Sequence, residues 1–168
     1  PSTDPIVADL LQSKGMAGML STVWLIISAM AFGGVMEAAG FLTRITQSLV
    51  SLAHSAAGLI GATLATCGLI NITAGDQYLA IVVPGRMFKD AYRERGLAPE
   101  NLSRCLEDSG TVTSALVPWN TCGAYQSATL GVATGEYFVY AVFNWVSPIM
   151  SWIIALIGFR IRKLNSQE

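Results

Sequence analysis

Four long stretches without a charged side chain divide this chain, and they run over residues 15–36, 45–75, 109–135 and 137–159. A helix needs about 20 mainly apolar residues to cross the hydrocarbon core of a bilayer, so each stretch is long enough to span it. Only 12% of the 168 residues are charged, whereas a soluble domain usually carries about 25%. The pattern predicts an all-α, polytopic bundle of transmembrane helices in a lipid bilayer, with approximate spans over 16–43, 49–75, 109–134 and 137–159.

Polar segments inside the second and third stretches favour discontinuous helices. We expect the second span to break near residues 71–77 and to continue to residue 85. Pro118 disfavours helix at the residue before it, and Gly123 loosens the chain soon after, which predicts a break near residues 117–123. Two half-helices with an unwound centre, or a re-entrant hairpin, fit residues 109–134 equally well, and the sequence leaves both open.

The segment from Asn71 to Gln77 is the first candidate ion site. An acidic side chain at the bilayer centre costs about 2.5–3.5 kcal/mol on insertion scales, so Asp76 is expected inside a protein cavity. Burial disfavours the charged form of a carboxylate, which lets Asp76 hold a proton and exchange it for Na⁺. Thr73 adds a neutral oxygen nearby. The alternative is that Asp76 only caps the helix that follows, since Asp is a favoured N-cap residue, and both roles can hold together.

Neutral oxygen donors around the second break form another candidate site. Unwound helix frees backbone carbonyls for cation binding, and hydroxyl and amide oxygens suit a dehydrated cation. Hydrogen bonding between helices is the alternative role for these side chains. We predict ion or proton binding by Asp76, Asn71, Thr73, Asn120 and Thr121, with Na⁺ held at Asp76, Asn120 and Thr121. We predict a pathway lined by Thr111, Thr113, Ser114, Gln77 and Glu37.

Other function classes find no support in the sequence. No nucleophile–base pair, phosphate loop or metal-ligand spacing is visible, so we expect neither an enzyme nor a cofactor. The net charge of −1 gives no support for nucleic-acid binding. The lone histidine, His54, is interpreted as a capping or interfacial residue.

Basic residues suggest an orientation in the membrane. The connector over residues 86–108 carries five of them, and the tail carries Arg160, Arg162 and Lys163. Such residues concentrate in short cytoplasmic loops. We therefore expect the connector and the C-terminal tail on the cytoplasmic side of a multi-pass protein.

The two polar breaks resemble the NhaC family of bacterial Na⁺/H⁺ antiporters. The resemblance rests on residues 75–78, 84–88, 107–114 and 117–125, with further support from residues 4–9 and 32–37. It implies the C-terminal part of a longer transporter of the bacterial plasma membrane, which exchanges Na⁺ and H⁺. It also implies an ion transporter superfamily architecture of two inverted repeats, with the ion site shared with a missing N-terminal half.

Two other functions fit the same pattern. A Na⁺- or H⁺-coupled exchanger of organic anions, such as a malate/lactate antiporter, keeps the fold and changes the substrate. A membrane scaffold subunit without transport would use the polar breaks only for packing. The chain does not begin with Met, which leads us to expect a piece of a longer protein, and a homo-oligomer is compatible with all three functions.

Overall fold

The computed structural model describes residues 15–41, 44, 48 and 55–164, and this part of the chain is helical. Predictions that fall on residues 42–43 and 49–54, including the role of His54, lie outside the described residues. Where the backbone is described, residues Leu97 and Lys163 form an isolated β-bridge. The helices are α2 (Gly15–Ala38), α4 (Ala56–Thr73), α5 (Gln77–Glu94), α6 (Pro99–Cys105), the π-helix η1 (Leu106–Thr111), the 3₁₀ helix η2 (Val112–Leu116), α7 (Thr121–Leu130), α8 (Thr134–Tyr137) and α9 (Val142–Ile157).

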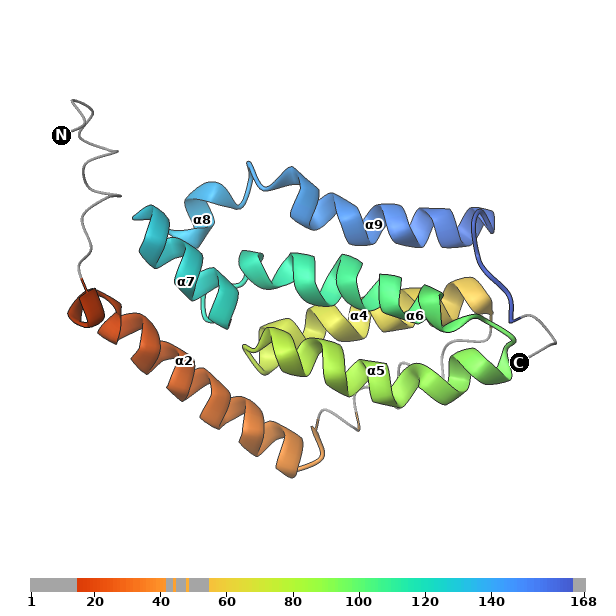
Figure 1. Cartoon of the computed structure of the whole chain (residues 1–168), viewed down its shortest axis with the longest axis horizontal. Helices are drawn as coiled ribbons and strands as arrows, with labels where there is room; N and C mark the ends of the chain where they lie inside the picture. Colours follow the sequence, from red (N-terminus) through yellow and green to blue (C-terminus); the bar gives the residue numbers. More distant parts are fainter. Residues whose placement is uncertain (1–14, 42–43, 45–47, 49–54, 165–168) are drawn as a thin grey trace.

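The helices lie in a bundle with one outlying member (Figure 1). Helices α4, α5 and α9 run roughly alongside the helical segment formed by α6, η1 and η2, whereas α2 lies apart and at an angle. Helices α2 and α4 are long and apolar enough to cross a membrane, and α9 is a shorter apolar helix. Large apolar side chains of α2, such as Trp24 and Ile27, are exposed. This outer surface fits a protein that lies in a bilayer.

Helix α5 differs from the expected half-helix that ends near residue 85, because it continues through Pro84 to Glu94. Proline inside a helix costs about 3 kcal/mol, since one backbone hydrogen bond is lost. Phe88 and Tyr92 lie beyond it, and both are fully buried in the main core with Leu59 of α4. Burial of each large side chain stabilises the fold by about 1.5–3 kcal/mol, which outweighs the proline.

The connector over residues 86–108 is largely helical. Helix α6 begins at Pro99, a favoured first helical residue, and helical backbone then continues through η1 and η2 to Leu116. Arg104 pairs with Asp108 one turn later at 3.6 Å, and Asp108 accepts hydrogen bonds from Ser147 and Ser151 of α9.

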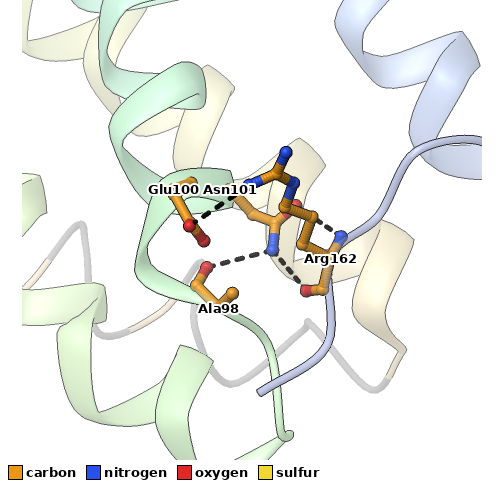
Figure 2. A network of polar contacts seen from close by, with 4 residues as sticks. All are labelled: Ala98, Glu100, Asn101 and Arg162. Carbon is orange, nitrogen blue, oxygen red and sulfur yellow. Dashed lines mark hydrogen bonds and ion pairs between the residues drawn. The ribbon is translucent and has the colours of Figure 1, made fainter. Parts of the chain in front are cut away.

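The C-terminal tail packs against the turn between α5 and α6 (Figure 2). The amide of Asn101 donates to the carbonyls of Arg162 (2.7 Å) and Ala98 (3.0 Å), and its side-chain oxygen accepts from the backbone N–H of Arg162 (3.1 Å). The guanidinium of Arg162 also lies 3.5 Å from Glu100. The tail and this turn therefore share one end of the molecule, whereas α7 and α8 lie at the other end (Figure 1).

The last expected span, 137–159, also begins differently. The short helix α8 ends at Tyr137, and α9 starts only at Val142. The hydroxyl of Tyr137 donates to the carbonyl of Ala115 at 2.6 Å, which fixes the α8 end against η2.

Candidate functional site

The helical path is interrupted between Thr73 and Gln77. Gly75 has φ of +65°, a left-handed conformation that costs little in glycine alone, so α4 cannot run on into α5. Asp76 is the N-cap of α5, and its Oδ1 accepts from the N–H of Leu79 at 2.9 Å. The sequence places this interruption at 71–77, and the non-helical residues are the narrower set 74–76.

A second interruption separates η2 from α7. Val117 is extended, and Asn120 is the N-cap of α7, where its Oδ1 accepts from the N–H of Cys122 at 3.1 Å. The next turn packs closely on the break, since a Cβ at position 123 would overlap the carbonyl oxygen of Val117. Only glycine fits at Gly123, so α7 folds back tightly on the residues before it.

The two interruptions are hydrogen-bonded to each other. The backbone N–H of Thr121 donates to the carbonyl of Gly75 at 3.0 Å. The indole N–H of Trp119 donates to the carbonyl of Ile72 at 2.7 Å. Carbonyls left without a helical partner at the end of α4 are thereby satisfied by the second break. Segments more than 40 residues apart in sequence thus form one polar centre.

Two buried amides lie at the middle of this centre. Asn120 donates from Nδ2 to Oδ1 of Asn71 at 3.0 Å, and both side chains are 0% exposed. Asn71 donates in turn to the carbonyl of Gly110 (2.8 Å) and to the hydroxyl of Thr113 (3.0 Å). Buried polar groups need such partners, because an unsatisfied one costs about 1–3 kcal/mol. The amides therefore lock α4, η1 and α7 together.

The side chain of Gln77 extends the polar centre. Its Oε1 accepts from the hydroxyl of Ser114 at 3.4 Å and from the thiol of Cys122. Ser114 is also bonded to the carbonyl of Thr111 at 2.6 Å. The hydroxyl of Thr121 donates to the Asn120 amide oxygen at 3.3 Å.

Asp76 is the ionisable member of the centre. The residue is 7% exposed, and within the described ranges 15–41, 44, 48 and 55–164 no Lys or Arg forms an ion pair with it. A carboxylate supplies oxygen atoms of the kind that hard cations prefer as ligands, so Asp76 is a candidate cation ligand.

Two predicted residues lie away from the others. Thr73 bonds back to the carbonyl of Leu69 at 2.8 Å and lines a cavity against α2. Glu37 is exposed on α2 and joins none of the hydrogen bonds of the polar centre described above. Helical periodicity explains why Thr73 lies away from the polar centre, because it is on a different face of α4 from Asn71.

Sequence reasoning missed some contributors. Trp119 lies within the predicted second break, and its indole N–H, a group that often finds an acceptor, bonds the carbonyl of Ile72 although the residue is 47% exposed. Asp108 was assigned to the solvated connector, yet it bonds two serines of α9. Its spacing of four residues from Arg104 is the signal that could have identified a helix there.

Comparison with known proteins identifies the family. The model of the Na⁺/H⁺ antiporter family matches residues 6–159. The chain is 42% identical over 158 residues to an uncharacterised Na⁺/H⁺ antiporter of Haemophilus influenzae, covering 93% of this chain and 33% of that protein. It is 34% identical over 161 residues to the Na⁺/H⁺ antiporter NhaC of Alkalihalophilus pseudofirmus, covering 96% of this chain and 35% of that protein.

A relative with another substrate is similar to a comparable degree. The malate-2H⁺/Na⁺-lactate antiporter of Bacillus subtilis is 33% identical over 150 residues, which cover 89% of this chain and 31% of that protein. No solved structure matches the chain. The chain spans about a third of the length of the curated relatives it matches. Because the family model matches most of its length, this chain belongs to the Na⁺/H⁺ antiporter family.

Proposed function

We propose that this chain is part of a secondary transporter that exchanges Na⁺ for H⁺ across a bacterial plasma membrane. The observation that carries the proposal is Asp76, a nearly buried carboxylate in an interruption that a second interruption contacts through Thr121 and Gly75. Family membership supports the same conclusion.

Competition at Asp76 accounts for exchange. Na⁺ prefers oxygen ligands, and a carboxylate can neutralise either Na⁺ or a proton but not both at once. Oδ1 of Asp76 is used as the cap of α5, so the cation would bind through Oδ2, with the hydroxyl of Thr121 and backbone carbonyls of the interruptions as further ligands. Protonation of Asp76 removes the charge and releases Na⁺.

The two buried amides take a different part in this proposal. Asn71 and Asn120 already satisfy each other, and in the described part of the chain no buried side-chain nitrogen or oxygen lacks a partner. They hold the interruptions in register, and ion binding through the Asn120 oxygen requires that its bonds to Thr121 and Cys122 open first.

The interrupted helices suit a transporter built from inverted repeats. Such folds place discontinuous helices near the bilayer midplane, where free helix ends and carbonyls handle ions. In this proposal, α4–α5 and η2–α7 are the discontinuous helices of one repeat. The rest of the transporter supplies the other repeat, and the complete protein is the unit in which exchange occurs.

The proposed orientation has the connector and the tail in the cytoplasm. The hydrogen bonds between Asn101 and Arg162 support it (Figure 2), because they hold these two basic segments together. Their basic residues favour the cytoplasmic side.

Exchange of organic anions is the second candidate function. It is favoured by the likeness to the malate-2H⁺/Na⁺-lactate antiporter. Three cavities, of about 610, 560 and 350 Å³, are lined without Lys or Arg. A site for a carboxylate substrate usually presents a cation, and these three linings present none.

Flux measurements on the full-length protein test the proposal. In proteoliposomes that contain a pH-sensitive dye, an imposed Na⁺ gradient is expected to move protons without any organic anion. Asp76→Asn keeps the size of the side chain and its capping oxygen, and we expect it to abolish the exchange. Asp90→Asn is the matched control, because Asp90 is exposed on the same helix.

Three results would contradict parts of the proposal. Wild-type exchange in Asp76→Asn removes Asp76 from the mechanism. Proton movement that requires added malate or lactate would establish the organic-anion exchanger instead. Absence of any flux from correctly folded wild-type protein would favour the scaffold subunit.

A further inference from the structure

Helix α2 passes beside both interruptions, and two cavities open along it. A Cβ at Gly75 would lie 3.2 Å from the Cβ of Ala29, which shows how close α2 comes to the first break. One cavity, here called the outer cavity, has a volume of about 560 Å³ and lies between α2, α7 and the start of α8. The other, the inner cavity, has a volume of about 350 Å³ and lies between α2 and the residues that precede Asp76.

Four of the residues that line the outer cavity carry a hydroxyl group. Hydroxyls from both of its sides face it, and its lining residues include no charged side chain. Ser127 and Thr134 share a hydrogen bond of 2.8 Å at its wall, and Ser21 and Thr22 lie on the α2 side. A cavity of this size with several polar partners can hold ordered water, and hydroxyls can replace part of the water shell of a small cation.

The inner cavity lies beside the first interruption. Thr73 and Gly75 line it, and Gly75 directly precedes Asp76 in the chain. Trp119 lines it from the second interruption, while the preceding residue, Pro118, lines the outer cavity. The two cavities thus border neighbouring residues of the second interruption.

Leu25 is the residue common to both linings. It lies on α2 between the hydroxyl-lined outer cavity and the inner cavity beside the first break. A leucine provides no ligand for an ion, and apolar constrictions can close a path by excluding water. Leu25 therefore presents an apolar side chain to both cavities.

We propose that the outer cavity is the aqueous access route from the side of the membrane opposite the connector, and that Leu25 is its apolar gate before Asp76. The direction follows from the fold, since α7 and α8 lie at the end of the molecule away from the C-terminal tail (Figure 1). This inference rests on the proposed transport function, which gives the route its cargo and places the connector in the cytoplasm.

Labelling of introduced cysteines in the full-length protein tests the route. Single-cysteine variants Ser127→Cys, for the outer cavity, and Thr73→Cys, for the inner cavity, are treated in whole cells with a charged, membrane-impermeant methanethiosulfonate. We expect rapid modification at position 127 from outside and slow modification at position 73. Adding Leu25→Ala should speed modification at position 73 several-fold and leave position 127 unchanged, because only the gate is widened.

The control substitution is Leu20→Ala. Leu20 is on the same helix, is 64% exposed and lines neither cavity, so its truncation should leave the labelling rates unchanged. Should Leu25→Ala fail to fold, Leu25→Phe offers the opposite test, in which a larger side chain slows modification at position 73.

Two outcomes would overturn the inference: labelling of position 127 only from the cytoplasmic side, or a rate at position 73 that ignores the size of residue 25. Labelling does not require transport. If labelling at position 73 depends on residue 25 but the protein shows no Na⁺/H⁺ exchange, the proposed function is refuted and the route stands. If the protein exchanges Na⁺ and H⁺ but labelling at position 73 does not depend on residue 25, the route is refuted and the proposed function stands.

Discussion

The paired amides Asn71 and Asn120 give a prediction whose size follows from the contacts. Asn120→Ala removes the cap of α7, which costs about 1 kcal/mol, and leaves the buried amide oxygen of Asn71 without its donor, which costs about 1–3 kcal/mol more. We expect a loss of about 2–4 kcal/mol in the free energy of unfolding. Asn71→Ala should cost a similar amount, because the carbonyl of Gly110 and the hydroxyl of Thr113 lose their donor.

A double-mutant cycle isolates the contact. The bond between the two amides is lost in either single variant, so the double variant should cost less than the sum by about 1–2 kcal/mol. Unfolding of the full-length protein in mixed micelles, followed by tryptophan fluorescence, measures each free energy. Thr73→Ala is the control, since its hydroxyl bonds only within α4, and it should cost under about 0.5 kcal/mol. Additive losses for Asn71 and Asn120 would refute the lock between the interruptions.

Three further predictions concern other parts of the fold. Gly123→Ala forces a Cβ into a backbone carbonyl and should destabilise the protein by about 1–3 kcal/mol. Gly135→Ala is the control, because a Cβ there meets open space. Equal losses of stability for the two variants in thermal unfolding would contradict the packing at Gly123. Burial raises the pKa of the Cys105 thiol to about 11, so single-cysteine protein carrying only Cys105 should react slowly with maleimide at pH 8 and faster as the pH rises toward 11. Protein carrying only the half-buried Cys122 should react faster at pH 8, and the reverse order would show that α6 is not packed as described. Asp108→Ala removes bonds from η1 to α9 and should lower the free energy of unfolding by about 1–2 kcal/mol after allowance for its partial exposure; an unchanged denaturation midpoint would show that these bonds do not hold α9.

The sequence predicted the helical class, whereas discontinuous transmembrane helices and an inverted repeat stay predictions. Uncharged runs favour helices, and Gly75 and Pro118 disfavour helix at or next to their own positions. These effects are local, so the sequence alone can predict them. The lengths of the helices were harder to predict from the sequence. Helix α5 continues past Pro84 because the side chains beyond it are buried against α4. The long-range packing that decides this is not encoded in any local pattern.

The ion-binding role of the candidate site stays a prediction, and the structure shows only how its residues are arranged. The sequence drew attention to Asn71 and Asn120, but the bond between them joins residues 49 positions apart, which propensity and spacing do not predict. Glu37 and Thr73 were included for their chemistry, and the fold places them elsewhere. The direction in which a side chain points depends on its position within the helix. The sequence predicts where a helix begins and ends only to within a few residues.

The most direct test of the exchange at Asp76 is the release of protons when Na⁺ binds. Purified full-length protein in weakly buffered detergent solution is mixed with NaCl, with choline chloride as the ionic-strength control, and the proton release is read from a pH dye. We predict a release from the wild type, its retention in Glu37→Gln and its loss in Asp76→Asn. An undiminished release from Asp76→Asn would show that the proton exchanged for Na⁺ comes from another group.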